Sequence, residues 1–151
     1  MSLNAIQLNP IGTVRTDVAN DEIARRRREL VSQIEIYPQY QQALVGLDAY
    51  SHIFVLFWMD RADAPESLLC HPRGNTSLPQ CGVLAARGRN HPNSLGLAVC
   101  ELKAMNDNVL TVTRLDAFDA TPVLDIKPYD DYDQVQSPRV PEWFSQRARN
   151  P

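Results

Sequence analysis

The most apolar stretch of the chain, residues 52–59, places the first limit on its fold. It reads HIFVLFWM and is far shorter than the roughly 20 residues that a membrane-spanning helix needs. It is also rich in the β-branched and aromatic residues that favour strands. We therefore expect residues 52–59 to form a strand in a hydrophobic core.

Other short segments have strand-like patterns and are separated by turn signals. Residues 109–115 alternate as a half-buried strand does, and the Asn-Asp-Asn sequence at 106–108 predicts a hairpin turn before them. Pro10 and Gly12 favour an edge position or a bulge for the first strand. The other predicted strands are residues 6–16, 33–37, 82–86, 96–103 and 122–126. About seven short strands predict a mainly β fold, a barrel or a sandwich.

The segments between these strands predict short helices and loops. Residues 20–31 predict a short helix or an ordered loop, with Asn20 or Asp21 as its cap. Residues 62–81 are rich in Pro, Gly, Ser and Asn and predict a long loop, which in a compact domain is more often functional than filler. From residue 136 onward we expect the chain to wrap the surface, anchored by two adjacent aromatic residues, Trp143 and Phe144.

Length and composition fit one globular domain that spans residues 1–151. Hydrophobic residues make up 44% of the chain and charged residues 22%, which is typical of a folded domain. The opening sequence, MSLNAIQLNP, lacks the basic-then-apolar pattern of a signal peptide. We expect a cytoplasmic protein that does not contact a membrane.

Several common sites lack their signatures. The chain contains no G-x-G-x-x-G, no P-loop motif and no G-x-S-x-G, which argues against a Rossmann site, a P-loop and a hydrolase elbow. The three histidines have no metal-ligand spacing, and Cys70, Cys81 and Cys100 form no C-x-x-C motif. Zinc binding by Cys70, His71 and Cys81 is an alternative that the irregular spacing disfavours. We expect no metal site and interpret the cysteines as buried or idle thiols.

The charge balance gives a weak indication of the ligand. A net charge of −3 and a pI of about 5.5 do not indicate a nucleic-acid-binding protein. Among the 15 basic residues, however, only Lys103 and Lys127 are lysines. The planar guanidinium of arginine suits phosphate or carboxylate, so this bias favours anion recognition. The arginines at 25–28 fit a solvated helix face or, alternatively, a contact with RNA phosphates.

Two polar segments stand beside predicted strand ends. Residues 86–96 read ARGRNHPNSLG, and residues 119–132 read DATPVLDIKPYDDY. Each has a purely structural interpretation, the first as a solvated connection that turns at Pro92 and the second as an edge strand protected by charge and proline. Because both occur beside strand ends in one small β protein, we favour a shared site.

Four blocks of the sequence follow one another in a fixed order and span about residues 11–133: IGTVRT, ALVGLDAYSHIFVLFWM, GVLAARGRNHPNSLGLAVCEL and LDAFDATPVLDIKPYDDYD. Together these blocks resemble the TsaA-like family of TrmO-type (YaeB) tRNA methyltransferases. The resemblance implies a single-sheeted β-barrel that binds S-adenosylmethionine without a Rossmann fold. It further implies methyl transfer to N6 of the modified adenosine t6A at position 37 of tRNA, and a homodimer with the cofactor near the subunit boundary.

The resemblance also assigns candidate site residues. Asp119 and Asp125 are the candidates for accepting the proton that leaves the adenine amino group. The implied cofactor contacts are Arg26, Asp60, Arg61, Arg87, Leu97, Asp119, Ala120, Thr121 and Pro122. The implied substrate contacts, on the anticodon loop of tRNA, are His91, Asn93, Lys127 and Tyr129.

The sequence departs from the family pattern at three places. The usual R-P-N-P-I-G is HPNSLG at residues 91–96, the usual Thr before Arg87 is Ala86, and the usual Gly of D-G-T-P is Ala120. Alanine there adds a methyl group where φ is positive or a ligand is close. Two alternatives therefore stand beside the tRNA methyltransferase: a protein that binds S-adenosylmethionine with another acceptor, and a non-catalytic dimeric regulatory module.

Overall fold

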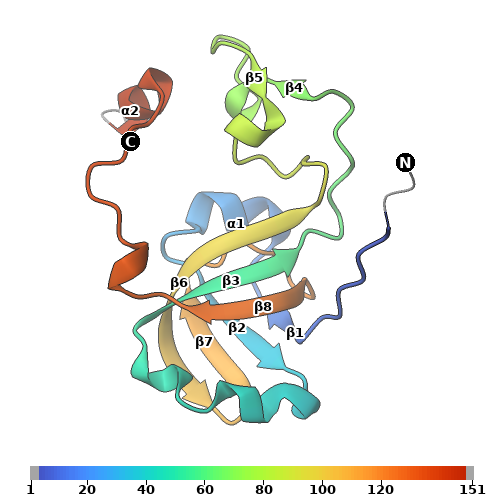
Figure 1. Ribbon diagram of the computed structural model, residues 1–151, viewed down its shortest axis with the longest axis vertical. Coiled ribbons are helices and arrows are strands. Elements are labelled where there is room, and N and C mark those ends of the chain that lie inside the picture. The colour runs from blue at the N-terminus through green and yellow to red at the C-terminus, as the bar shows by residue number, and fades with distance from the viewer. Residues whose placement is uncertain (1–3, 149–151) are drawn as a thin grey trace.

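The computed structural model describes residues 4–148 and contains a closed β-barrel (Figure 1). Neighbouring strands in the barrel are antiparallel, in the order β1-β2-β7-β6-β3-β8. Their bounds are β1 Gly12–Arg15, β2 Val31–Ile36, β3 His52–Trp58, β6 Leu95–Asn106, β7 Val109–Thr113 and β8 Pro122–Pro128. The expected mainly β, single-sheeted, non-Rossmann barrel is confirmed.

Two further strands and several short helices lie outside the barrel. Strands β4 (Leu69–Cys70) and β5 (Cys81–Gly82) pair with each other in a separate sheet. The helices are α1 Asn20–Arg26 and α2 Glu142–Ala148, and the 3-10 turns are η1 Pro38–Leu44, η2 Leu47–Ala49, η3 Pro72–Gly74, η4 Val83–Ala85 and η5 Asp131–Asp133. Within residues 4–148, no helix has the length and hydrophobicity that crossing a membrane requires.

The barrel encloses the hydrophobic core because its strands alternate between inward and outward side chains. In β3, Ile53, Val55 and Phe57 are buried, as the apolar pattern of residues 52–59 predicts. Ala98 and Cys100 fill the same core from β6. Burying a side chain of the size of Val, Ile or Phe contributes about 1.5–3 kcal/mol. Slippage by one residue would turn this apolar set outward, so the register is strongly fixed.

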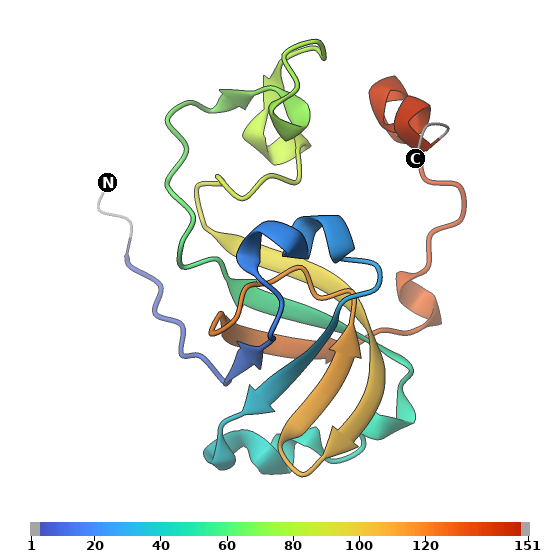
Figure 2. The same cartoon turned by 180° about the vertical axis from the view of Figure 1, so that it is seen from behind.

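The barrel has two different ends (Figures 1 and 2). At one end, η1, η2 and the turn between β6 and β7 lie together, and Leu44 of η1 is buried there. At the other end, α1 lies against the barrel with Ile23 buried, and Leu30 after it is buried too. The segment that contains β4, η3, β5 and η4, residues 69–85, extends beyond this second end, and we name it the β4–β5 lobe.

Three local predictions were wrong. Residues 6–11 are not in a strand: β1 begins only at Gly12, Ile11 N–H bonds to the carbonyl of Val123 just before it, and Ile6 is 87% exposed. Strand β1 is also not an edge strand, since it pairs with both β2 and β8. The predicted strand at residues 82–86 is mostly η4, in which Ala86 N–H bonds back to the carbonyl of Val83.

The predicted helix cap was wrong as well, and the predicted long loop contains more structure than expected. The N-cap of α1 is Ala19, and no side chain caps this helix, because Asn20 already lies in its first turn. The segment at residues 62–81 contains β4 and η3 and begins β5.

The buried hydroxyl of Ser32 gives a stability prediction. Its side chain is 2% exposed on β2, and Oγ has no hydrogen-bond partner among the described residues. An unpaired buried polar group costs about 1–3 kcal/mol. Ser32→Ala is therefore expected to raise the free energy of unfolding by about 1 kcal/mol, measured by urea denaturation. A loss of stability would show that Ser32 Oγ has a partner, such as a buried water.

Candidate functional site

The end of β3 and the start of β8 meet at the barrel end nearest the β4–β5 lobe. The antiparallel register places Phe57 opposite Val123, so the residues that follow β3 lie beside those that precede β8. Arg61 bridges the two segments, because its Nη2 donates a hydrogen bond to the carbonyl oxygen of Asp119 at 2.8 Å. Its guanidinium carbon also lies 5.7 Å from the ring centroid of Phe118. Two segments that the sequence predicts to bind the cofactor are thus joined directly.

The turn at residues 119–122 is held firmly against β1. Asp119 Oδ1 accepts a hydrogen bond from the backbone N–H of Thr16 at 3.1 Å. The N–H of Ala120 donates to the carbonyl of Val14, and the N–H of Val14 donates to the carbonyl of Thr121, both at 2.9 Å. Thr121 is 3% exposed. The segment therefore presents the exposed Asp119 carboxylate from a fixed backbone.

Ala120 adopts the left-handed backbone conformation, with φ of 64°. This conformation costs an L-residue about 1–2 kcal/mol, and glycine avoids that cost. The family pattern D-G-T-P has glycine at this position, the residue that adopts a positive φ without strain.

Ala120→Gly is expected to raise the free energy of unfolding by about 0.5–1 kcal/mol in urea denaturation, because the strain exceeds the larger chain entropy of glycine. The matched control is Ala24→Gly in α1, an exposed helical position, where a loss of about 0.5–1 kcal/mol is expected. Equal losses in both variants would contradict strain at Ala120.

The start of β6 forms the next part of the same barrel end. Trp58 pairs with Leu95, and the N–H of Met59 donates to the carbonyl of Ser94 at 2.8 Å. Arg87 Nη2 donates to the carbonyl of Leu97 at 2.8 Å, so these two predicted cofactor residues are in contact.

The loop before β6 is folded back on itself. His91 Nε2 bonds to the carbonyl of Ala86 at 2.8 Å, which requires that nitrogen to carry the proton. The carbonyl of Asn93 accepts a hydrogen bond from the N–H of Leu95. The predicted substrate residue His91 therefore lies next to Ala86 and Arg87, and Asn93 lies in the turn that leads into β6.

The predicted residues further along β8 lie away from this cluster. Asp125 is about 10 Å along the strand from Pro122, given about 3.3 Å per residue. Its Oδ2 pairs with Lys127 Nζ at 3.0 Å on the outer face of the barrel. Tyr129 packs on Phe54, with ring centroids 5.4 Å apart, at the far end of the strand. The structure thus separates Asp125, Lys127 and Tyr129 from Asp119.

The remaining candidate, Arg26, belongs to α1 at this barrel end. Its Nη1 lies 3.5 Å from Glu22 Oε2 one helical turn earlier, and both side chains are about half exposed. Such an exposed pair holds the arginine weakly. Within the described part of the chain, no group of three or more His, Cys, Asp or Glu side chains is arranged to hold a metal ion.

Comparison with known proteins places this geometry in a family. A model described as the tRNA-methyltransferase O N-terminal domain, TrmO_N, matches residues 21–134. The chain belongs to the TrmO_N family. A solved structure of TrmO from Pseudomonas aeruginosa is 31% identical and has a TM-score of 0.73, covering 90% of this chain and 61% of that one. The family expected from the four sequence blocks is confirmed.

Two archaeal relatives are named as probable S-adenosyl-L-methionine-binding proteins. One, from Methanothermobacter thermautotrophicus, is 39% identical over 140 residues, which is 91% of this chain and 98% of the relative. The other, from Archaeoglobus fulgidus, is 36% identical over 146 residues, which is 93% of this chain. The chain spans 38% of that second relative and under two thirds of the solved TrmO chain.

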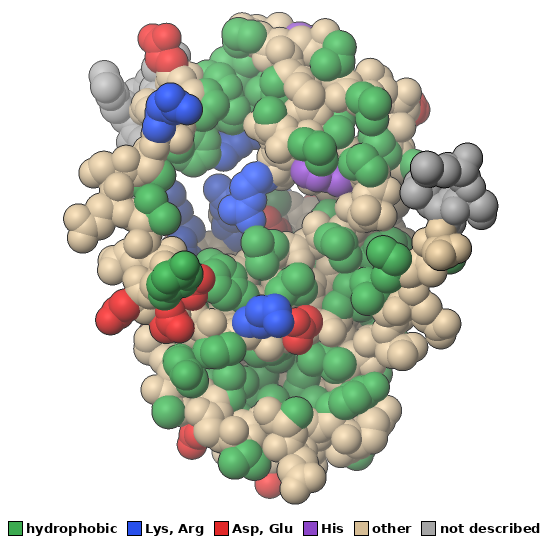
Figure 3. Space-filling model, in the orientation of Figure 1, with side chains coloured by type: hydrophobic (Ala, Val, Ile, Leu, Met, Phe, Trp, Pro, Cys, Tyr) green, Lys and Arg blue, Asp and Glu red, His purple; other side chains and the backbone are tan. Residues whose placement is uncertain are grey.

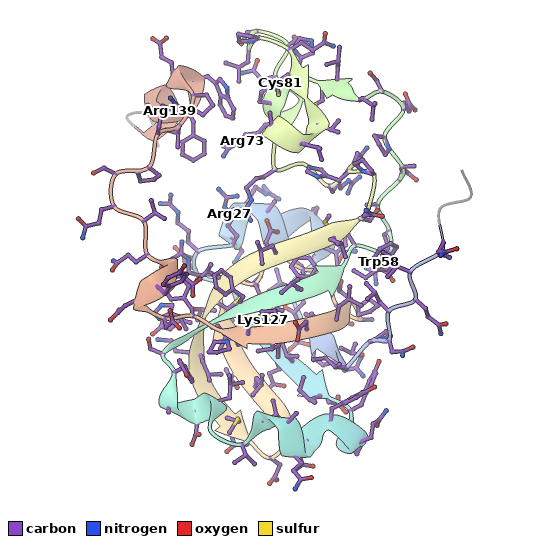
Figure 4. All side chains as sticks on the ribbon, in the orientation of Figure 1. Arg27, Trp58, Arg73, Cys81, Lys127 and Arg139 are labelled. Carbon is purple, nitrogen blue, oxygen red and sulfur yellow. The ribbon has the colours of Figure 1, made fainter. Side chains whose placement is uncertain are left out.

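Three residues in and around this cluster were not anticipated from the sequence. Thr16 and Phe118 hold Asp119 and Arg61, as described above. Both lie inside the family blocks, but the Thr16 contact uses its backbone, which leaves no side-chain signal. The third residue is Arg73 of η3 in the β4–β5 lobe, whose guanidinium carbon lies 5.9 Å from the ring centroid of Phe144. Figure 3 shows a hollow between barrel and lobe with basic side chains on it, and Figure 4 places Arg27 and Arg73 on opposite sides of that space.

Proposed function

We propose that this chain is an S-adenosylmethionine-dependent methyltransferase that acts in the cytoplasm on N6 of t6A at position 37 of tRNA. The description of its family as tRNA-methyltransferase O supports this proposal, as do the names of its archaeal relatives. The structural observation that carries it is the bond from Arg61 to the Asp119 carbonyl, which joins two predicted cofactor segments at one barrel end.

The charged groups at this barrel end suit the proposed cofactor. S-adenosylmethionine carries a sulfonium, an ammonium and a carboxylate, and supplies an electrophilic methyl group when bound. The exposed carboxylates of Asp60 and Asp119 would hold the cationic groups, and the guanidiniums of Arg61 and Arg87 would hold the carboxylate. The rigid backbone at residues 120–122 would offer polar groups to the adenine ring.

Asp119 is the proposed proton acceptor. The adenine amino group would take the methyl group as the methyl carbon–sulfur bond of the sulfonium breaks and the sulfur leaves as a thioether. The amino group would lose a proton, and a nearby carboxylate would receive it. Asp119 lies within the proposed cofactor cluster, whereas Asp125 lies further along β8 and pairs with Lys127. Most of the rate enhancement would come from the alignment of the amino group with the methyl group.

The loop at 91–93 and the hollow beside it are the proposed tRNA contact. His91 and Asn93 lie in the loop that leads into β6, and Arg27 and Arg73 border the hollow. Arginine side chains there would neutralise phosphates of the anticodon loop. Because that loop is single-stranded, turning out its adenine costs less than opening a duplex. Lys127 and Tyr129 would contact RNA only on the outer barrel face.

A homodimer is part of this proposal. Leu95, Leu97 and Val99 alternate on the outer face of β6 and are 39–50% exposed, and Trp58 on the neighbouring strand is 39% exposed. Figure 3 shows hydrophobic side chains over this face of the barrel. A second copy would cover them and bring its own residues near Leu97. Light scattering should give a dimer for the wild type and a monomer for Leu97→Glu; a wild-type monomer would contradict the proposal.

Cofactor titration and methyl transfer test the function separately. Isothermal titration with S-adenosylmethionine is expected to show binding that Asp119→Asn and Arg87→Ala abolish. Incubation with labelled cofactor and total tRNA is then expected to label the adenosine at position 37. Binding without that label would favour another acceptor, and absence of binding would favour the non-catalytic module. Wild-type affinity in both variants would refute the proposed site.

A further inference from the structure

Cys70 and Cys81 stand directly opposite each other in the β4–β5 lobe. They are paired across the two short antiparallel strands, next to the pair formed by Leu69 and Gly82. Directly opposed residues have Cα atoms about 4.5–5.5 Å apart. A disulfide bridges Cα atoms about 4.4–6.8 Å apart. Oxidation can therefore join the two residues without rearranging the strands.

The surroundings of the two thiols also favour their joint reaction. Both cysteines are free and half-buried, so small oxidants reach them. The pKa of Cys81 is raised from its ordinary value, first by burial and then by its hydrogen bond with Cys70 and by the charge of a Cys70 thiolate. That hydrogen bond joins the two thiols directly, so the sulfur of one cysteine lies within reach of the sulfur of the other.

The third cysteine offers an internal comparison. Cys100 is fully buried in the barrel core, and burial raises its pKa to about 12. A thiol that is both inaccessible and protonated does not react readily. Reactivity therefore belongs to the pair in the lobe.

We propose that Cys70 and Cys81 form a site of reversible oxidation, which a hydroperoxide converts into an intramolecular disulfide. The Cys70 thiolate attacks one peroxide oxygen and becomes a sulfenic acid as the O–O bond breaks. The other oxygen leaves as hydroxide or alkoxide and takes up the proton that Cys70 gave up, forming water or an alcohol. The sulfur of Cys81 then attacks the Cys70 sulfur and displaces hydroxide, which takes up the Cys81 proton and leaves as water. With hydrogen peroxide, two thiols and one peroxide give one disulfide and two waters.

The disulfide would restrain the lobe next to the proposed cofactor site. Strands β4 and β5 contain two residues each, and such a short sheet is marginally stable by itself. The chain leaves β5 through η4 and reaches Arg87 shortly afterwards. A covalent link keeps the two strands together when the lobe opens locally. Backbone amides of the lobe then exchange hydrogen more slowly.

Intact mass and peptide mapping test the proposal on the full chain. Treatment of the reduced protein with hydrogen peroxide is expected to lower the mass by about 2 Da, reversibly with dithiothreitol. Trypsin cleaves after Arg73, so Cys70 and Cys81 fall into different peptides that the disulfide holds together. Cys100→Ser should behave as the wild type, whereas Cys70→Ser and Cys81→Ser should not form the link.

Two results would overturn the proposal. One is a wild-type protein that gains only oxygen atoms or stays unchanged, and the other is a link that involves Cys100 or a second chain. Thermal melting of each variant shows that it is folded before oxidation. Hydrogen exchange then reports the effect on the lobe: slower exchange at residues 69–85 in the oxidised protein is expected, and equal exchange would refute the restraint. These measurements need neither S-adenosylmethionine nor tRNA.

Discussion

Gly96→Ala is expected to lower the free energy of unfolding by about 3 kcal/mol. A Cβ atom at this position would overlap the ring of Phe57. The ring carbons would lie closer to it than neighbouring atoms lie to the Cβ atoms of real proteins. Phe57 is 4% exposed inside the barrel, so its ring cannot turn away without displacing the core. Overpacking of this kind costs about 1–3 kcal/mol or more. In thermal unfolding, Tm should fall by roughly 8 °C.

Two further variants show whether the overlap is the cause. Gly88→Ala is the matched control, because a Cβ atom there meets nothing within 4 Å, and its stability should change by less than about 0.5 kcal/mol. Phe57→Leu removes the ring that Gly96 faces. The double variant should therefore lose less stability than the sum of the two single losses. If the two single losses add up to the loss of the double variant, the overlap with the Phe57 ring is not the cause of the loss at Gly96.

The strands of the barrel were predictable where the apolar pattern was strong. Residues 52–59 and 109–115 could be read correctly, because a hydrophobic core imposes its alternation on a strand. The apolar residues at 83–85 misled the prediction. Val83 is buried and Leu84 is 79% exposed, yet the backbone turns there, since local hydrogen bonds replace a partner strand. The two-residue strands β4 and β5 are too short to leave a pattern.

The candidate site was predictable as a set of segments but not as a set of contacts. Asp60, Arg61 and Asp119 came from the resemblance to the family, and the register of β3 with β8 brings them to one barrel end. The contacts themselves run largely through backbone carbonyls, as from Arg61 to Asp119 and from Arg87 to Leu97. Every residue has a backbone carbonyl, so the sequence cannot predict which carbonyl accepts the hydrogen bond of an arginine.

Arg61 is consequently expected to position the proposed cofactor site. Its hydrogen bond to the Asp119 carbonyl and its contact with Phe118 fix the β7–β8 turn relative to the end of β3. The proposed hydrogen bond from this guanidinium to the cofactor carboxylate would contribute about 1.5–3 kcal/mol to binding. Arg61→Ala is therefore expected to weaken S-adenosylmethionine binding about 30-fold in isothermal titration. The free energy of unfolding should change by less than about 1 kcal/mol, since Arg61 is exposed.

Comparison variants separate positioning by Arg61 from a general loss of positive charge. Lys103→Ala removes a cation whose partner is the exposed Glu101 on β6, and its affinity for the cofactor should stay within about twofold of the wild type. Arg61→Lys keeps the charge but loses the planar fork, so its affinity should fall between those of the wild type and Arg61→Ala. If Arg61→Lys binds as the wild type does, charge alone suffices. If Arg61→Ala also binds normally, the bridge between β3 and the turn has no part in holding the cofactor.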